Sequence, residues 1–257
     1  MNETLLSVAE SAARAGGEVL LAWEGRVQAR EKGPNDLVTE ADLEAQDTIE
    51  AVIRGHFSNH DFLGEEGNTT WPRQSEYRWI VDPLDGTTNF IHGLPQYAVS
   101  IGVEHKSQLV AGVIFDPKSN ECFTAQRGGG AHLNGTAMRV SSCREIEEAL
   151  LVASFSPQVS RDSMEIRRFI EVIVSCRAMR RLGSAALNLA YVAAGRLDGY
   201  WATSLKTWDV AAGALILREA GGTLSGVDGR PFDLEHPTIV ATATETLHRQ
   251  LLEVLRD

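Results

Sequence analysis

The stretch from Trp79 to Phe90 constrains the fold of this chain more than any other part of the sequence. The segment Tyr77–Val81, which leads into it, is rich in aromatic and β-branched residues and therefore predicts a buried strand. We expect this strand to end at Asp82, because Pro83 has no N–H to donate to a neighbouring strand and holds the preceding residue extended. The chain must then turn within a few residues.

Two carboxylates and a predicted helix start meet in that turn. Asp82 and Asp85 flank a two-residue bend, and Gly86 permits a tight turn that a side chain would block. Thr87 and Thr88 would open a short helix, whose free N–H groups attract an anion that the carboxylates alone would repel. A divalent cation held by the carboxylates resolves this conflict and predicts metal-assisted hydrolysis of a phosphate ester. The alternative is a plain surface turn, since Asp, Pro and Gly are ordinary turn residues.

Charge and composition narrow the classes of partner. The chain has 24 Lys and Arg against 35 Asp and Glu, a formal net charge of −11, which disfavours nucleic acid and anionic membranes as partners. A phosphorylated small molecule stays possible if a metal inverts the local charge. Cys122, Cys143 and Cys176 have no C-x-x-C spacing, which indicates free thiols in a reducing compartment. With no basic segment at the start and no apolar run of membrane-spanning length, we expect a cytoplasmic protein without a membrane anchor.

The first half of the chain predicts two helices followed by antiparallel strands. Apolar residues at three- and four-residue steps predict a helix over Leu5–Trp23, and a turn cluster covers Lys32–Asp36. Thr39 is a candidate N-cap for a second helix that ends near Phe57. The alternating segments that follow predict strands over Tyr97–Glu104, Gln108–Phe115 and Glu121–Gln126, and one more strand after the Gly128–Gly130 triplet through Val140.

Two acidic positions in this half are further candidates. Asp42 lies where a capping box places its acid, and it shares a helical stripe with Ala45, so it faces inward. It either only caps the helix or polarises a water molecule. Glu65 and Glu66 end the short strand that begins at Phe62, and strand ends are where functional sites gather. Adjacent glutamates are nevertheless more often part of a solvated surface.

From about residue 141 the pattern changes to alternating strands and helices, which predicts helices layered on a second, mixed sheet. We interpret residues 1–257 as one domain with a subdomain border near residue 141. The expected strands are Leu150–Ala153, Ala178–Leu182, Gly199–Ala202, Gly222–Leu224 and Thr238–Ala241. The expected helices are Met164–Ile173, Ser184–Gly195, Trp208–Ala220 and Glu245–Arg256.

Two places in the second half could carry chemistry. Asp209 lies in the first turn of the helix that begins at Trp208, where it either complements the helix dipole or binds a metal. The segment Arg180–Ala185 is a strand end running into a helix start, so its N–H groups and side chains could grip a substrate. The candidate contacts there are Arg180, Gly183, Ser184 and Ala185, and a solvated basic pair is the alternative.

Four features occur in one order along the chain: Glu65-Glu66, the Trp79–Phe90 stretch, the glycine-rich segment Arg127–Gly135, and Trp208–Gly213 with the sequence Trp-Asp-Val-Ala-Ala-Gly. In this arrangement the chain closely resembles the inositol monophosphatase family of Mg²⁺-dependent, lithium-sensitive phosphatases. The resemblance spans essentially the whole chain, and the two aspartate motifs together are highly specific.

The resemblance implies an α/β fold, a layered α-β-α-β-α sandwich with an antiparallel N-terminal sheet and a mixed C-terminal sheet. It also implies two or three Mg²⁺ ions and a homodimer. The implied metal ligands are Glu65, Asp82, the backbone carbonyl of Leu84, Asp85 and Asp209. The implied catalytic residues are Asp42 and Thr87, which would orient the attacking water, and Glu66. The implied substrate contacts are Asp85, Gly86, Thr87, Thr88 and Asp209, together with those of the Arg180–Ala185 segment.

One position departs from the family pattern. Members that hydrolyse inositol phosphates typically carry a glutamate seven positions before the helix-start aspartate, and this chain has Ala202 there. A methyl group cannot accept hydrogen bonds from sugar hydroxyls. The resemblance therefore implies hydrolysis of an inositol-1-phosphate-like or other sugar or polyol phosphate, with histidinol phosphate, fructose bisphosphate or a nucleotide 3′-phosphate as alternatives. The alternative of another class is a regulatory interaction protein that keeps the fold.

Overall fold

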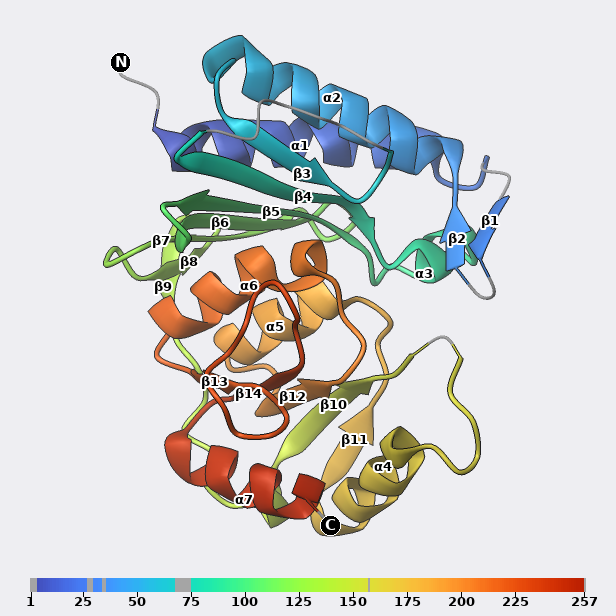
Figure 1. Ribbon diagram of the computed structural model, residues 1–257, viewed down its shortest axis with the longest axis vertical. Helices are drawn as coiled ribbons and strands as arrows, with labels where there is room; N and C mark the ends of the chain where they lie inside the picture. Colours follow the sequence, from blue (N-terminus) through green and yellow to red (C-terminus); the bar gives the residue numbers. More distant parts are fainter. Residues whose placement is uncertain (1–3, 27–29, 34–35, 68–74, 157, 257) are drawn as a thin grey trace.

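The computed structural model describes residues 4–26, 30–33, 36–67, 75–156 and 158–256, which form alternating layers of helices and sheets (Figure 1). Helices α1 (Leu5–Trp23) and α2 (Glu40–His56) cover the outer face of the first sheet. Helices α5 (Ala185–Ala193) and α6 (Thr207–Glu219) lie between the two sheets, and α4 (Met164–Ser175) and α7 (Glu245–Arg256) cover the far face of the second sheet. The predicted α-β-α-β-α sandwich is confirmed.

The first sheet holds the central stretch of the sequence. Its strands lie in chain order from β3 to β9, and neighbouring strands are antiparallel from β4 onward, while β3 adds a parallel edge. The strands are β3 (Asp61–Gly64), β4 (Tyr77–Asp85), β5 (Ala98–His105), β6 (Gln108–Asp116), β7 (Glu121–Gln126), β8 (Ala131–Leu133) and β9 (Thr136–Met138). The short helix α3 (Thr87–Ile91) follows β4 directly.

The second sheet is mixed, as the sequence predicts. Its strand order is β11-β10-β12-β14-β13, in which β10 runs parallel to β11 and β12 while β14 runs antiparallel to both of its neighbours. The strands are β10 (Leu150–Ser154), β11 (Ala178–Arg180), β12 (Gly199–Ala202), β13 (Thr223–Ser225) and β14 (Ile239–Thr242), and the short 3₁₀ helix η1 (Ile146–Glu148) precedes them.

Strand β4 is longer than predicted. The sequence predicts that it ends at Asp82, but the strand continues to Asp85, with Asp82 opposite Ser100 and Asp85 opposite Ala98. The register shifts between these two pairs, so the ladder skips Pro83 and its missing N–H costs no hydrogen bond. The irregularity sets the two aspartates in the same strand end rather than on opposite sides of a free turn.

Two further segments differ from the prediction in their turns. The strand expected through Val140 is a hairpin instead, because Asn134 and Gly135 both adopt positive φ, 47° and 78°, as a tight two-residue turn between β8 and β9 requires. The turn cluster Lys32–Asp36 joins β1 (Arg30–Gly33) and β2 (Asp36–Val38), which pair as a separate ribbon. Residues 34 and 35 of that cluster lie outside the described residues.

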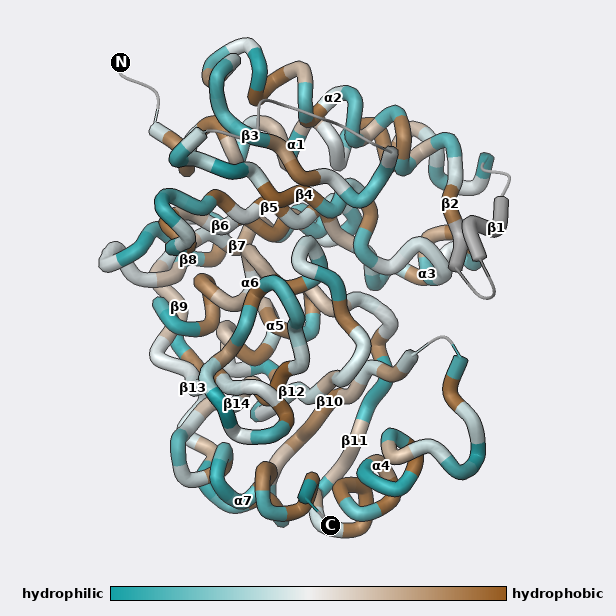
Figure 2. Tube along the Cα trace, viewed as in Figure 1, coloured by the Kyte–Doolittle hydropathy of each residue, from teal (hydrophilic) through white to brown (hydrophobic). Residues whose placement is uncertain are grey.

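Apolar side chains fill the space between successive layers. Trp79 belongs to the cluster under α1 and α2, Leu187 to the cluster around α5 and α6, and Trp201 to the cluster under α7, and all three are fully buried. Figure 2 shows hydrophobic segments where the layers meet and hydrophilic segments on the outer turns and loops. Strand β5 is buried along nearly its whole length, as expected for a strand covered on both faces.

Helix α6 approaches the first sheet unusually closely. A Cβ at Gly102 of β5 would lie 2.7 Å from the Cβ of Ala211, and one at Gly112 of β6 would lie 2.9 Å from the carbonyl oxygen of Ala212. Larger residues at these two strand positions would push the helix outward. The glycines therefore determine how deeply the start of α6, which carries Asp209, sits against the sheet.

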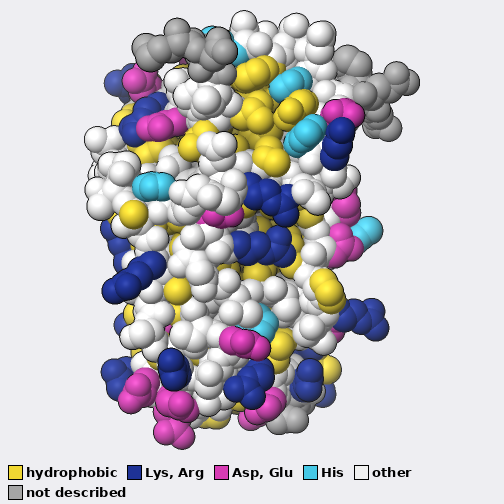
Figure 3. Space-filling model, turned by 90° about the vertical axis from the view of Figure 1, so that its left-hand side faces the viewer, with side chains coloured by type: hydrophobic (Ala, Val, Ile, Leu, Met, Phe, Trp, Pro, Cys, Tyr) yellow, Lys and Arg dark blue, Asp and Glu magenta, His cyan; other side chains and the backbone are white. Residues whose placement is uncertain are grey.

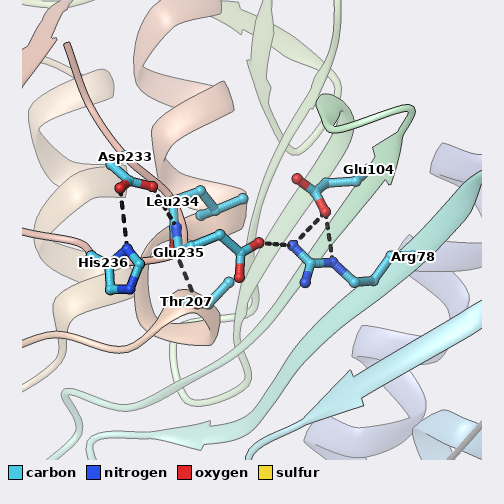
Figure 4. A network of polar contacts seen from close by, with 7 residues as sticks. All are labelled: Arg78, Glu104, Thr207, Asp233, Leu234, Glu235 and His236. Atoms are coloured by element: carbon cyan, nitrogen blue, oxygen red, sulfur yellow. Dashed lines mark hydrogen bonds and ion pairs between the residues drawn. The ribbon is translucent and has the colours of Figure 1, made fainter. Parts of the chain in front are cut away.

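An ion-pair network joins the same helix start to the sheet from outside (Figure 4). The guanidinium of Arg78 on β4 pairs with Glu104 on β5 at 2.6 Å and with Glu235 in the loop between β13 and β14. In that loop the carbonyl oxygen of Leu234 accepts a hydrogen bond of 3.0 Å from the hydroxyl of Thr207, the first residue of α6. The loop thus links the start of α6 to the first sheet.

The surface carries charges of both signs. On the face drawn in Figure 3, Lys and Arg side chains lie interspersed with Asp and Glu. Within the described part of the chain, no helix combines the length and the apolar character that crossing a membrane would need.

We predict that Gly112→Ala destabilises the protein by about 1–3 kcal/mol, because the added methyl group meets backbone that cannot rotate away. The matched control is Gly55→Ala near the end of α2, where the methyl group meets nothing within 4 Å. That variant gains about 0.5–1 kcal/mol because alanine loses less conformational entropy in a helix than glycine. Urea titrations give both unfolding free energies, and a Gly112→Ala midpoint equal to that of the unaltered protein contradicts the close approach of α6.

Candidate functional site

Three acidic side chains from the two halves of the chain converge at one point. Carboxylate oxygens of Asp82, Asp85 and Asp209 all lie within 4.8 Å of one another. Asp82 and Asp85 come from the end of β4, and Asp209 comes from the first turn of α6. Asp82 and Asp85 are buried, and Asp209 is the most accessible of the three. Nothing local in the sequence brings residues so far apart together, so the layer packing makes this cluster.

Each carboxylate is held by backbone donors. Asp82 Oδ1 accepts a hydrogen bond of 3.0 Å from the N–H of Leu84, which lies within the bulge of β4. Asp209 Oδ2 accepts one of 2.8 Å from the N–H of Lys206, as a capping-box acid does. These contacts fix one oxygen of Asp82 and one of Asp209.

Asp85 links the end of β4 to the start of α5. Its Oδ2 accepts a hydrogen bond of 2.7 Å from the N–H of Ala186 in the first turn of α5 and another from the hydroxyl of Ser184, the N-cap of that helix. The sequence predicts Ser184 and Ala185 as substrate contacts through this helix start. In the structure the start of α5 is engaged by Asp85, and Ser184 also caps the helix through its hydroxyl.

Burial and mutual repulsion make the negative charge of the cluster unfavourable without a counter-ion. Loss of solvation, and then the charges of Glu65 and Asp85, raise the pKa of Asp82 well above its usual range. Burial raises the pKa of Asp85 to about 6, although the donors of α5 oppose the rise. The pKa of Asp209 is also raised, by loss of solvation and then by the charge of Asp85. Strongly shifted pKa values in a cluster of acids are a mark of functional sites.

The donor set fits a hard divalent cation. Mg²⁺ takes oxygen ligands in a near-octahedral shell and is usually held by a few carboxylates, with water and substrate phosphate completing the shell. Glu65 follows β3, and its N–H donates to the carbonyl oxygen of Val81 on β4, which brings it to the same edge. Its carboxylate is not one of the three within 4.8 Å, but its charge raises the pKa values of Asp82 and Asp209. Such a cation would relieve the repulsion that otherwise raises these pKa values.

Asp42 and Thr87 meet beside the cluster. The hydroxyl of Thr87 lies 3.4 Å from Asp42 Oδ1 and 3.2 Å from the carbonyl oxygen of Leu84, another predicted metal ligand. The other oxygen of Asp42 accepts hydrogen bonds of 2.8 Å and 2.6 Å from the N–H and hydroxyl of Thr39. Asp42 therefore caps α2 and also faces the site, so the two interpretations of the sequence are compatible.

Glu66 is not part of a solvated surface. It is buried, and its backbone N–H and carbonyl both bond to the side-chain amide of Gln46, with an N···O distance of 2.9 Å for the N–H. Gln46 is not among the site residues that the sequence predicts. A signal is present, because Gln46 lies four residues after Asp42 on the inward stripe of α2 and is an unusual polar residue there.

A second polar residue that the sequence analysis passes over is Asn89, which ties two loops of the site together. Its amide donates to the carbonyl oxygens of Gln96 and Leu182, both at 2.7 Å. Gly86 has a φ of 101°, and a Cβ there would lie 2.8 Å from the oxygen of Gln96 and 3.4 Å from that of Gly183. Only a glycine at position 86 lets these two turns pack so closely.

A cavity of about 430 Å³ opens beside Asp85. Three of the residues predicted as substrate contacts line it, Thr88, Gly183 and Ala185. Arg180 does not line it. The Arg180 side chain is exposed and donates to the carbonyl oxygen of Met179, while Arg181, which the sequence analysis does not single out, reaches the cavity.

Comparisons with known proteins agree with this architecture. A family model described as the inositol monophosphatase family matches residues 1–257. The chain is 43% identical over 260 residues to an inositol-1-monophosphatase of Mesorhizobium japonicum, covering 98% of this chain and 96% of that one. It is 42% identical over 251 residues to the Nus factor SuhB of Pseudomonas aeruginosa, covering 95% of this chain and 93% of that one. The crystal structure of the extragenic suppressor protein suhB of Bartonella henselae superposes with a TM-score of 0.94 at 38% identity, covering 99% of both chains.

We predict that MgCl₂ raises the melting temperature of the unaltered protein and has much less effect on Asp82→Asn. In metal-free protein the raised pKa values mean that the folded state binds more protons than the unfolded state from about pH 4 upward, so stability falls as pH rises through that range. Asp82→Asn removes one of the repelling charges. Without metal, the difference in unfolding free energy between this variant and the unaltered protein is therefore more favourable to the variant at pH 8 than at pH 5.

The matched control is Asp47→Asn on the exposed face of α2, which keeps the full response to Mg²⁺. Melting curves in EDTA and in MgCl₂ at both pH values supply the data. An equal Mg²⁺ response in Asp82→Asn and in the unaltered protein rejects the carboxylate cluster as the metal site.

Proposed function

Because the chain belongs to the inositol monophosphatase family, we propose that it is a Mg²⁺-dependent phosphatase that hydrolyses a small phosphate monoester, inositol-1-phosphate-like or another sugar or polyol phosphate. The observation that carries the proposal is the convergence of Asp82, Asp85 and Asp209 within 4.8 Å beside a cavity. Buried carboxylates alone would repel an anionic ester, whereas a divalent cation bound to them would attract it.

The proposed metal ligands are the acidic cluster and its neighbours, for two or three Mg²⁺ ions. They are Glu65, Asp82, the carbonyl oxygen of Leu84, Asp85 and Asp209. When bound, Mg²⁺ supplies Lewis-acid stabilisation of the phosphoryl oxygens and lowers the pKa of water. The hydrogen bonds from Leu84, Lys206 and Ala186 hold the carboxylates ready, so little reorganisation accompanies binding.

The proposed catalytic pair is Asp42 and Thr87. The Thr87 hydroxyl, between Asp42 and the carbonyl oxygen of Leu84, can accept a hydrogen bond from a water molecule while it donates its own proton to one of those oxygens. Asp42 stays ordered through Thr39 and can take a proton from the same water. Glu66, ordered by Gln46, is the third proposed catalytic residue. No histidine base is required.

The substrate phosphate would meet the start of α3. Gly86, Thr87 and Thr88 form the tight turn after β4, and N–H groups at a helix start suit an anion. Gly183 and Ala185, which also line the cavity, would contact the rest of the substrate. The alternatives of histidinol phosphate, fructose bisphosphate and a nucleotide 3′-phosphate stay open, because Ala202 alters the expected contact to sugar hydroxyls. Lithium sensitivity and a homodimer are part of the same proposal.

A second candidate function is an interaction role in which the fold binds a macromolecular partner. The relatives described as Nus factors favour it. The ordered set of acidic side chains favours the phosphatase, since an interaction surface needs no buried cluster of repelling carboxylates. Negligible hydrolysis of every phosphate ester, together with tight binding to a protein or RNA, would favour the interaction role.

We predict that Asp82→Asn abolishes phosphate release in the presence of Mg²⁺ and that Thr87→Val lowers kcat at least about 100-fold, a typical contribution of a positioned proton-transfer group. The control is Thr48→Val, which replaces a half-buried threonine of α2 whose hydroxyl donates to the carbonyl oxygen of Glu44 in the same helix. Phosphate release is measured over a panel of sugar, polyol and nucleotide esters. Full activity of Asp82→Asn overturns the metal assignment, and full activity of Thr87→Val overturns the role of the hydroxyl.

A further inference from the structure

The cavity beside the acidic cluster has one cationic end. Among the described residues that line it, the charged ones are Asp85, on the side of the cluster, and Arg181. The other lining residues are neutral: Thr88, Asn89, Ser154, Phe155, Ser156, Val159, Gly183 and Ala185. A substrate whose phosphate lies near Asp85 and Thr88 would extend its remaining groups along neutral walls toward a guanidinium.

The guanidinium of Arg181 is positioned but not neutralised. Its Cζ lies 4.5 Å from the centroid of the Phe155 ring, within the range of a cation–π contact. In the described part of the chain, no carboxylate pairs with it. Phe155 is itself fixed, because its ring packs edge-on against Phe169 at 5.2 Å and tilted against Trp201 at 5.6 Å. The aromatic contact thus holds the positive charge at the cavity and leaves its N–H donors available.

Among the described lining residues, Asp85 is the one that brings a carboxylate acceptor for sugar hydroxyls. Ala202 lies opposite Ser154 in the register of β12 and β10, and its methyl group is fully buried. Glu165 of α4 accepts hydrogen bonds from the N–H of Ser156 at 3.2 Å and from the hydroxyl of Thr203, and it does not line the cavity. Asp85 is engaged at the start of α5. A polyol would therefore find few carboxylate acceptors here.

We propose that Arg181 is a specificity-determining residue that makes this protein prefer phosphate monoesters carrying a second anionic group, either a second phosphate or a carboxylate. This inference rests on the proposed phosphatase function. A guanidinium recognises both groups through paired N–H···O hydrogen bonds. A local cation is needed for such a preference, because a chain with a net charge of −11 repels an ester that carries two anionic groups.

The test compares substrates that differ only in the second charge. Glycerol 2-phosphate and 2-phosphoglycerate have the same size and phosphate position, and a carboxylate replaces one hydroxymethyl group in the second. Fructose 1-phosphate and fructose 1,6-bisphosphate form the matching pair for a second phosphate. We predict that the unaltered protein with Mg²⁺ favours the doubly anionic member of at least one pair by roughly tenfold in kcat/KM, about one charge-assisted hydrogen bond.

Arg181→Met keeps an apolar stem against Phe155 and removes the charge. We predict that it brings this ratio close to one and leaves kcat/KM for the ester without a second anionic group within about threefold, because only the charge-assisted contacts to the second group are lost. Arg181→Lys keeps the charge without the paired donors and gives an intermediate ratio. Arg180→Met is the matched control, because its side chain lies outside the cavity, and it keeps the full ratio. Melting curves of all three variants check folding.

The outcomes separate this inference from the function on which it rests. If the unaltered protein hydrolyses esters with one anionic group as efficiently as esters with two, or if Arg181→Met leaves the ratio unchanged, the role of Arg181 is rejected and the phosphatase proposal stands. If no ester of either kind is hydrolysed in Mg²⁺, the proposed function fails and the inference fails with it. A preference for the carboxylate pair alone, or for the bisphosphate pair alone, identifies which second group the guanidinium recognises.

Discussion

The hydrogen bonds between Asp85 and the first turn of α5 are the interaction on which the candidate site depends. A buried carboxylate is costly without donors, and Asp85 takes its donors from the N–H of Ala186 and the hydroxyl of Ser184. The end of β4 in the first sheet is thereby tied to the central helices. Asp209, at the start of the neighbouring helix α6, arrives within reach of Asp85 only because Gly102 lets that helix approach the sheet.

The clustered carboxylates repel one another at the place where a metal ion would bind. Three clustered carboxylates with raised pKa values lower the stability of the metal-free protein, and the large apolar layers around them can tolerate that cost. The repulsion favours a divalent cation, and bound cations would then favour an anionic ester. Charge alternates along the site in the proposed function: carboxylates, metal, phosphate, neutral walls and the guanidinium of Arg181. The carboxylates and the metal would make hydrolysis possible, and the guanidinium of Arg181 would decide which esters bind.

Local signals predicted the elements well and their junctions less well. The helix over Leu5–Trp23 and the cap at Thr39 follow from periodicity and side-chain chemistry, which act within a few residues. The end of β4 depends on pairing with β5, and that pairing carries the strand past Asp82 by shifting register. The choice between two adjacent arginines is also tertiary. Strand β11 ends at Arg180, and Arg181 reaches the cavity because the ring of Phe155 lies under its guanidinium.

The sequence alone determined the layered fold class, the family and most of the acidic candidates, because caps, periodicities and motifs are encoded in neighbouring residues. The tertiary structure decided which of these side chains meet. It joined Asp42 to Thr87, ordered Glu66 through Gln46, and engaged Ser184 with an aspartate rather than leaving it free for a substrate. The physical reason is that hydrogen bonds and buried charges act over a few ångströms of space, and only chain packing determines which distant residues come that close.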